Sequence, residues 1–325
     1  MDPSFIQPLS IKREFIRKFA KDKKLSVFQK EHLSLLIAGI RVDYEIALRF
    51  CDYIKKNQIY IESFVNDLDS ESKDEFKEIL RNLEFMRTHT SMETIKEFLM
   101  KGDIVMEHLT NMESIKEKYA LPVNFYEESI FKYKHGLKYI PQDIVMSLNN
   151  KDFLDCGAYI GDSALMFIRD YNPSNVYSFE PIISNYNNLL KNKELNDLKK
   201  VIPINKGLGK ESSTLNIFSL DVSSHISEAG NAKIEVISID EFVKVNNLSV
   251  GLIKIDVEGY ELEVLKGAKK TIKKFRPVLL IGIYHNPEEF FETHKYLQSL
   301  IPDYEYKIKF LSDIRPLAEI HLIVW

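Results

Sequence analysis

The second half of the chain alternates between short, dense runs of apolar residues and segments rich in turn-forming or polar residues. Five of these runs predict buried strands at residues 152–155, 176–180, 201–206, 251–256 and 277–285. The last two runs are rich in Ile, Leu and Val, as parallel strands covered on both faces should be. Apolar residues at helical spacing predict intervening helices at 184–196 and 261–275. This alternation predicts a doubly wound α/β sheet.

The end of the chain departs from this alternation. Two further apolar runs, 304–311 and 318–325, are joined by the segment 312–316, which is too short for the crossover helix that a parallel connection needs. These two strands must therefore pair antiparallel or diverge. We predict a mostly parallel seven-stranded sheet that ends in a C-terminal antiparallel hairpin.

Residues 1–120 have a different composition and a different period. They contain only two glycines, Gly39 and Gly102, and their apolar residues recur at helical spacing. We predict an all-α N-terminal domain of four to six helices over residues 1–120, followed by an α/β domain over residues 121–325. The pattern leaves open whether the helices form a lid, an oligomerisation surface or a docking module. Between the two parts, residues 131–141 alternate around a glycine, which predicts a short hairpin.

Composition and charge narrow the class of protein. The chain has 325 residues, of which 45% are hydrophobic and 28% charged, and these values are ordinary for a soluble protein with a full core. A net charge of −4 argues against general binding to nucleic acids. Two cysteines, Cys51 and Cys156, do not form a disulfide framework, which fits a reducing compartment. There is no apolar run of 18 residues and no signal peptide, so we expect a cytoplasmic protein without an integral membrane segment.

A glycine-rich turn between the first predicted strand and the next helix carries the clearest chemical signal. Residues 155–162 have the sequence Asp-Cys-Gly-Ala-Tyr-Ile-Gly-Asp, and Gly157 and Gly161 let the backbone pass close to a ligand before the helix begins. The amides at that helix start would face a carboxylate or a phosphate. Glu180 ends the second predicted strand, 23 residues after Gly157, where an acid can hold ribose hydroxyls. These residues predict a site for a nucleoside cofactor.

The spacing of the glycines narrows the choice of nucleoside. A dinucleotide fingerprint has its glycines as Gly-x-Gly-x-x-Gly, which admits a pyrophosphate. Here the spacing is Gly-x-x-x-Gly, and the turn is opened by Asp155, whose carboxylate repels a pyrophosphate but suits an ammonium group. S-adenosylmethionine has an ammonium group, together with a carboxylate and a ribose. The alternative is an ordinary strand-to-helix turn of a doubly wound domain.

Three blocks of sequence stand out around this turn. They are residues 137–141 with 155–163, residues 177–181, and, most specific, residues 253–261 followed by 265–268. Together with residues 238–242, they resemble the FkbM family of S-adenosylmethionine-dependent methyltransferases. The resemblance runs from about residue 131 to residue 290, so the N-terminal helices inherit no role from it. It implies a class I, Rossmann-like methyltransferase fold and methyl transfer, usually to a hydroxyl of a sugar, a glycan or a polyketide-like product.

The expected topology and the resemblance together name the residues of a cofactor site. Open α/β sheets bind ligands outside the carboxyl ends of their strands. Asp155 and the turn 157–161 should hold the methionine end of the cofactor, and Glu180 should accept hydrogen bonds from both ribose hydroxyls. Residues 206–209 should border the adenine, although a glycine there could simply relax a loop. The predicted set is Asp155, Gly157, Ala158, Tyr159, Gly161, Asp162, Ser163, Glu180, Pro181, Gly207, Leu208 and Asp256.

Asp256, Glu258 and His285 are the predicted catalytic residues. Asp256 and Glu258 come at the end of the fourth predicted strand and can project from the same side of it, so either could position or deprotonate the acceptor hydroxyl. Paired, they could also hold Mg²⁺, which prefers oxygen ligands; alternatively, Glu258 stabilises a helix N-terminus. His285 is the last residue of the fifth predicted strand, and its unperturbed pKa of about 6.5 suits a general base at neutral pH. The alternative is a structural histidine.

Two further features border the predicted site. Lys254 lies inside the fourth predicted strand, where a buried lysine would need a carboxylate partner. Residues 219–233 are rich in serine and contain His225. This segment is long enough to be a loop that acts as a substrate lid, and the alternative for His225 is an exposed loop histidine.

The activity that the resemblance implies is S-adenosylmethionine-dependent O-methylation of a sugar or glycoconjugate. Open alternatives are a lipid, a peptide or a small natural product as the acceptor, and a catalytically idle, nucleoside-binding scaffold protein. We expect a carbohydrate or glycoconjugate as the partner, and no nucleic acid. A homo-oligomer formed through the helical N-terminal domain is a further open alternative.

Overall fold

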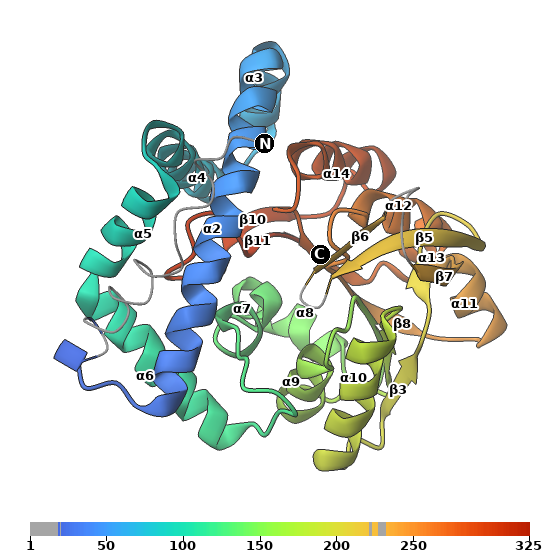
Figure 1. Ribbon diagram of the computed structural model, residues 1–325. Coiled ribbons are helices and arrows are strands. Elements are labelled where there is room, and N and C mark those ends of the chain that lie inside the picture. Colours follow the sequence, from blue (N-terminus) through green and yellow to red (C-terminus); the bar gives the residue numbers. More distant parts are fainter. Residues whose placement is uncertain (1–18, 20, 221–222, 227–231) are drawn as a thin grey trace.

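The computed structural model describes residues 19, 21–220, 223–226 and 232–325. Its N-terminal part is helical, and one long helix, α2, packs against four others (Figure 1). These helices are α2 (Val27–Lys56), α3 (Gln58–Asp67), α4 (Ser70–Thr88), α5 (Ser91–Met100) and α6 (Gly102–Lys118). The helical character predicted for this part of the chain is confirmed. None of the helices in the described ranges has the length and apolarity needed to span a membrane.

Short polar side chains set where the first of these helices begin. The hydroxyl of Ser26 accepts a hydrogen bond from the amide of Gln29, and the side chain of Gln29 accepts one from the amide of Ser26, which forms a capping box in front of α2. Asp69 is the N-cap of α4, and its side chain accepts from the amides of Glu71 at 2.9 Å and Ser72 at 3.2 Å. Each such cap stabilises its helix by about 1 kcal/mol.

A seven-stranded sheet forms the centre of the molecule and contains the seven strands predicted between residues 152 and 325. The strands are β1 (Asp152–Cys156), β2 (Val176–Phe179), β3 (Val201–Ile204), β8 (Val250–Ile255), β9 (Val278–Gly282), β10 (Tyr306–Phe310) and β11 (Ile320–Val324). Their order is β10-β11-β9-β8-β1-β2-β3, and all neighbours are parallel except that β11 runs antiparallel to β10 and β9. The predicted fold class is therefore confirmed. The antiparallel β11 begins at the sheet edge where the parallel strands end.

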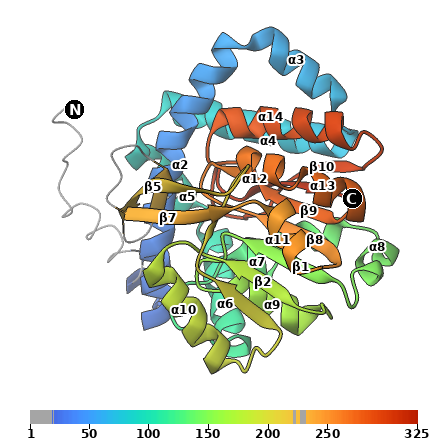
Figure 2. The same ribbon diagram turned by 90° about the vertical axis from the view of Figure 1, so that its right-hand side faces the viewer.

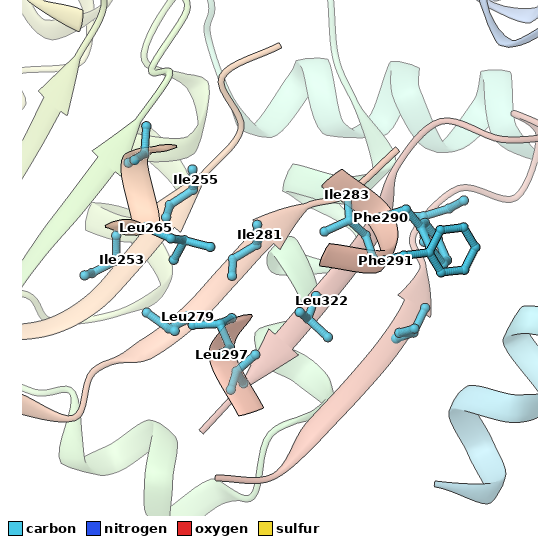
Figure 3. Close-up of a cluster of buried hydrophobic side chains, with 14 of the residues drawn as sticks. Ile253, Ile255, Leu265, Leu279, Ile281, Ile283, Phe290, Phe291, Leu297 and Leu322 are labelled. Atoms are coloured by element: carbon cyan, nitrogen blue, oxygen red, sulfur yellow. The ribbon is translucent and has the colours of Figure 1, made fainter. Parts of the chain in front are cut away.

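Helices cover both faces of this sheet, as the dense apolar strands require. One face is covered by α9 (Asp162–Asp170), α10 (Ile183–Leu195) and the short α7 (Glu128–Phe131), and the other by α11 (Ile239–Val245), α12 (Glu261–Gly267), α13 (Lys269–Phe275) and α14 (Pro287–Leu300). Side chains of β8 alternate between them, with Leu252 on the first face and Ile253 and Ile255 on the second. Figure 3 shows the second cluster, to which α12 contributes Leu265 and α14 contributes Leu297. Each of these buried side chains stabilises the fold by roughly 1.5–3 kcal/mol.

The N-terminal helices share this second core through an aromatic cluster. Phe290 and Phe291 of α14 meet Phe50 of α2, Phe64 of α3 and Phe76 of α4, with ring centroids 4.9 to 5.8 Å apart. All five rings are at most 4% exposed. The helical part therefore packs on the α/β part through hydrophobic contacts. The predicted division at residue 120 stays a prediction.

A second, smaller sheet was not predicted. Its strands β4 (Gly207–Leu208), β5 (Ser213–Leu220), β6 (Ser223–Ile226) and β7 (Ala232–Ile237) have the order β4-β7-β5-β6. Figures 1 and 2 show the paired strands β5 and β7 next to each other. The predicted lid over residues 219–233 is partly strand, since β5 ends in it, β6 lies in it and β7 begins in it. Residues 221–222 and 227–231 of that segment lie outside the described residues.

The hairpin predicted at residues 131–141 is wrong. That segment follows α7 and forms the 3₁₀ helix η2 (Lys134–Tyr139), which leads into α8 (Gln142–Ser147). His135 and Gly136 have φ values of +50° and +94°, so the chain reverses inside η2 and no strand can form there. The helix predicted over residues 261–275 is divided into α12 and α13.

Candidate active site

Backbone contacts to two neighbouring strands fix the glycine-rich turn after β1. The amides of Gly157 and Ala158 donate to the carbonyl oxygen of Phe179, at the end of β2, at 3.1 and 2.9 Å. Gly157 has a φ of +79°, and a Cβ atom there would lie 1.8 Å from the backbone oxygen of Asp256. Only glycine fits this position, and the ends of β1, β2 and β8 therefore meet at the turn.

The second half of the turn begins α9 and buries polar side chains. Gly161, with a φ of +77°, is the N-cap of α9. Asp162 is 3% exposed and accepts a hydrogen bond from the amide of Ser163 at 2.9 Å. Burial raises the pKa of Asp162 to about 7. The hydroxyl of Ser163 lies 2.8 Å from Nε2 of His135, so it already has a partner within the protein.

The carboxylate of Glu180 ties the end of β2 to this turn. Its Oε2 accepts from the amide of Tyr159 at 2.9 Å and its Oε1 from the amide of Ile182 at 2.8 Å. Glu180 is 5% exposed, and burial raises its pKa to about 7. A carboxylate has about four acceptor sites, and the side chain of Asn185 also bonds to Glu180. Binding of two ribose hydroxyls by Glu180 stays a prediction, and it requires Asn185 to release its acceptor site.

The remaining predicted cofactor residues lie beyond the ends of β2 and β3. The side-chain amide of Asn205 donates to the backbone oxygens of Glu180 at 2.8 Å and Pro181 at 3.1 Å, which links the two strand ends. Gly207 and Leu208 are buried and pair with β7 as strand β4, rather than forming the loop expected there. A border with adenine stays a prediction for both residues.

Asp155 has a charged partner inside the protein. Its Oδ1 lies 3.4 Å from Nζ of Lys254, which is opposite it in the register of β1 and β8, and both side chains are at most 5% exposed. Nζ of Lys254 also donates to the carbonyl oxygen of Gly157 at 2.7 Å. The expectation that a buried Lys254 needs a carboxylate is therefore confirmed. The ion pair fixes the start of the turn, and a contact of Asp155 with an ammonium group stays a prediction.

The three predicted catalytic residues lie together at the ends of β8 and β9. With Glu261, they form what we call the acid–histidine cluster. Nε2 of His285 lies 3.4 Å from Oδ1 of Asp256 and 3.6 Å from Oε2 of Glu258, and its Nδ1 lies 3.2 Å from Oε1 of Glu261. The side chain of Glu261 is fully buried, whereas that of Glu258 is 55% exposed. The cluster is therefore buried on the side of Glu261 and open to solvent on the side of Glu258.

The sequence assigned Glu261 only to the start of a helix. Its Oε1 also accepts from the amides of Val257 at 2.8 Å and Gly259 at 3.2 Å. These bonds hold the turn after β8, where Glu258 and Gly259 have φ values of +60° and +95°. An acid at a helix start is common, so it did not stand out. The signal that could have found it is three acids within six residues of a strand end, since Glu261 follows Asp256 and Glu258.

The carboxylates decide the protonation state of His285. Burial alone would lower the pKa of His285, but Glu261, Glu258 and Asp256 together outweigh burial and raise that pKa to about 10. His285 is therefore an imidazolium at neutral pH. The unperturbed pKa of about 6.5 that favoured His285 as a general base does not apply in this environment.

One group of side chains in the described ranges could hold a metal ion. It consists of Asp256, Glu261 and His285, whose ligand atoms lie within 4.8 Å of one another. The pair predicted to hold Mg²⁺, Asp256 with Glu258, is a different set. Because an imidazole suits transition metals better than Mg²⁺, this geometry gives the prediction of Mg²⁺ no support.

The sequence of the α/β part matches a known protein family. The family model of the methyltransferase FkbM domain matches residues 155–308. Residues 155–308 belong to the FkbM methyltransferase family. We call these residues, 155–308, the FkbM region. It contains the glycine-rich turn, Glu180 and the whole acid–histidine cluster, whereas helices α2–α6 lie outside it.

Two curated relatives match parts of the chain. The hexuronic acid methyltransferase AglP of Haloferax volcanii is 30% identical over 131 residues, which are 39% of this chain and 53% of that protein. Methyltransferase 1 of Beauveria bassiana is 26% identical over 152 residues and is covered to 61% of its length, against 38% of this chain. The matches thus span between half and two thirds of the relatives.

A solved structure shares the fold. The crystal structure of a methyltransferase FkbM from Methylobacillus flagellatus matches with a TM-score of 0.53 and 18% sequence identity, over 85% of this chain and 61% of that chain. At this identity, the match supports the seven-stranded fold alone.

Proposed function

We propose that the protein is an S-adenosylmethionine-dependent O-methyltransferase that methylates a hydroxyl of a sugar or glycoconjugate. The observation that carries the proposal is the position of the FkbM region. It covers the glycine-rich turn and the acid–histidine cluster, which meet at one edge of the sheet. This edge is where open α/β sheets bind ligands.

The residues at this edge fit S-adenosylmethionine. Gly157 leaves no room for a side chain, because a Cβ atom there would meet the backbone of Asp256, and this close packing brings the glycine-rich turn next to the end of β8. Glu180 has acceptor capacity left for a ribose hydroxyl, and for a second one if Asn185 releases its bond. The charge of Asp155 is balanced by Lys254. Asp155 therefore attracts an ammonium group less strongly than an unpaired carboxylate would. When bound, the cofactor supplies a methyl group activated by its sulfonium.

The acid–histidine cluster provides the groups that handle the acceptor proton. Asp256 lies at the end of β8 with one fifth of its side chain exposed, and its carboxylate accepts the proton of the acceptor hydroxyl. Burial raises the pKa of Asp256 above the usual value, which makes it a better base than an exposed aspartate. His285 stays protonated, and its ring holds Asp256 and Glu258 in place while Glu261 orients the ring.

The acceptor class rests on the relatives. The protein from Haloferax volcanii is named as a methyltransferase of hexuronic acid, a sugar derivative, and 39% of this chain matches it. A carbohydrate acceptor is therefore the class that we propose for this chain.

Calorimetric titration with S-adenosylhomocysteine tests the cofactor site. Glu180→Ala should weaken binding about tenfold or more, since losing hydrogen bonds to a charged group costs about 1.5–3 kcal/mol. Glu194→Ala, an exposed acid on α10, should leave the affinity unchanged. An affinity of Glu180→Ala within about twofold of the wild type would remove the ribose assignment.

Transfer of a labelled methyl group from S-adenosylmethionine to glycosides tests the chemistry. Asp256→Asn should lower the rate about 10²-fold or more, because general base catalysis contributes roughly 10²–10⁴-fold. Its affinity for S-adenosylhomocysteine should stay within about tenfold of the wild type. An unchanged rate would show that Asp256 does not accept the proton.

A further inference from the structure

A pocket lies where the N-terminal helices meet the α/β part, and we call it the junction pocket. It is lined by His32 of α2, His108 of α6, Glu127 and Glu128 around the start of α7, and Arg315 and Glu319 between β10 and β11. Figure 1 shows α2 and α6 beside α7. The pocket is open to solvent and has a cavity volume of about 50 Å³, so it can enclose a few hydroxyl-sized groups of a ligand while the rest of that ligand faces solvent.

The junction pocket adjoins the ends of the central strands. Glu319 directly precedes β11, which begins beside the end of β9, where His321 pairs with Gly282. The hydroxyl of Tyr284, the residue before His285, donates to Oε1 of Glu319 at 3.3 Å. Gly282 also approaches Asp256, because a Cβ atom there would lie 3.1 Å from Oδ1 of Asp256. Asp256 and Glu319 thus lie on either side of the end of β9.

The electrostatics of Glu127 agree with this placement. Burial raises the pKa of Glu127, and the charges of Glu319, Asp162 and Asp256 raise it further. A wall residue of the junction pocket is therefore within electrostatic range of both the glycine-rich turn and the acid–histidine cluster.

The N-terminal wall of the pocket is a row of buried polar side chains that lie close to one another. Oε1 of Glu128 lies 2.9 Å from Nδ1 of His108, and Nε2 of His108 lies 3.1 Å from Nε2 of His32. These three residues are 4 to 6% exposed. Nδ1 of His32 is buried and has no hydrogen-bond partner among the described residues. The ring of Phe125 lies 6.5 Å from that of His32, which adds an apolar surface to the pocket.

The charge of the pocket limits what it can bind. Among the described lining residues, Arg315 is the only lysine or arginine. Its charge is balanced by the buried Asp43, which accepts from Nε at 2.8 Å and from Nη2 at 2.5 Å. Glu128 and Glu319 supply carboxylates against this charge, whereas the raised pKa of Glu127 favours its neutral, protonated form. Carboxylates accept hydrogen bonds from hydroxyl groups and repel anions. The described lining therefore suits several hydroxyl donors and disfavours a carboxylate or a phosphate.

We propose that the junction pocket is the acceptor site, that α2 and α6 form its outer wall, and that it takes a neutral sugar rather than a uronic acid or a sugar phosphate. This inference rests on the proposed function. It gives the N-terminal helices a role in acceptor selection, and it separates this chain from a relative named for hexuronic acid.

The first experiment blocks the mouth of the junction pocket without altering the core. Leu35 lines the pocket and is 42% exposed, whereas Val42, on the same helix, is 54% exposed and is not among the lining residues. Leu35→Trp should raise the KM for a neutral methyl glycoside about tenfold or more, and Val42→Trp should leave it unchanged. Both variants should bind S-adenosylhomocysteine as the wild type does. An unchanged KM for Leu35→Trp would overturn the proposal.

The second experiment tests the charge preference. Labelled methyl transfer is measured with neutral methyl glycosides and with the matching uronic acid glycosides, and saturation-transfer NMR measures binding of the same compounds independently of turnover. The wild type should favour the neutral sugars about tenfold or more in both assays, and Glu127→Lys should shift that ratio towards the uronic acids. Preference of the wild type for the uronic acids, or binding of neither class, would overturn the acceptor site. Failure to bind S-adenosylhomocysteine would instead overturn the proposed function.

Discussion

The protonation of His285 depends on one buried acid, and replacing that acid gives a direct test. Glu261→Gln removes the charge 3.2 Å from Nδ1 of His285 but keeps an oxygen that can accept from the amides of Val257 and Gly259. The turn after β8 should therefore survive. We expect the pKa of His285 to fall from about 10 towards its ordinary range, because Glu261 is the strongest of the carboxylates that raise it.

The size of the effect follows from the difference between the two pKa values. Going from 6.5 to about 10 corresponds to roughly 5 kcal/mol of preference for the protonated form in the folded state, at about 1.36 kcal/mol per pKa unit. Removing the main contributor should lower the pKa of His285 by more than about 1. A raised pKa adds stability that is fully present below the unfolded value of about 6.5 and is lost as the pH rises through about 10. The Glu261→Gln protein should lose less stability than the wild type over that range.

NMR of histidine-labelled protein measures this pKa directly. The signal of His285 is assigned by its absence in His285→Gln, and its chemical shift is followed from pH 5 to 11, roughly the window set by the two pKa values. Urea unfolding at several pH values measures the linked stability. Glu263→Gln, on the same helix and paired with Lys266, is the control and should leave the pKa of His285 within about 0.3 of the wild type. A pKa in Glu261→Gln equally close to the wild type would refute the reasoning.

Two further predictions concern stability and are measured by urea unfolding. Gly157→Ala should cost at least about 3 kcal/mol, because its Cβ would meet the backbone of Asp256 at a positive φ. Gly102→Ala, at a helix start, should change stability by less than about 1 kcal/mol, because its Cβ would meet only the flexible end of Lys23, at an ordinary contact distance of 3.7 Å. Asp43→Asn should cost about 3 kcal/mol because it leaves the charge of Arg315 without its buried partner, and a cost below about 0.5 kcal/mol would mean that the pair contributes nothing to joining α2 to the segment before β11.

The main sheet could be predicted from the sequence because its strands are covered on both faces. Such strands are continuous apolar runs, and these runs are easily distinguished from the flanking helices and polar loops in the sequence. Strand β5 gives a weaker signal, since Leu215 and Ile217 alternate with Thr214 and Asn216 in a serine-rich segment. The turn within residues 134–139 was missed because alternation around a glycine is shared by hairpins and by irregular turns.

The sequence predicts where the candidate site lies, but it does not predict the pKa values and ion pairs within that site. Topology alone brings the ends of parallel strands to one edge, so Asp256 and His285 could be expected near each other. The pKa of His285 depends on Glu261, whose distance from the imidazole is fixed by the turn after β8. The balance of Asp155 by Lys254 likewise depends on the register of two strands. The sequence does not encode such distances in any local pattern.

The aromatic cluster between the N-terminal helices and α14 has a consequence for synthesis on the ribosome. Phe50, Phe64 and Phe76 are made early, and their partners Phe290 and Phe291 follow roughly 200 residues later. At about 5–20 residues per second, this delay lasts roughly 10–40 s. During that time, three large rings have no native partner on α14 to cover them. The nascent chain should therefore be a client for chaperones until α14 emerges.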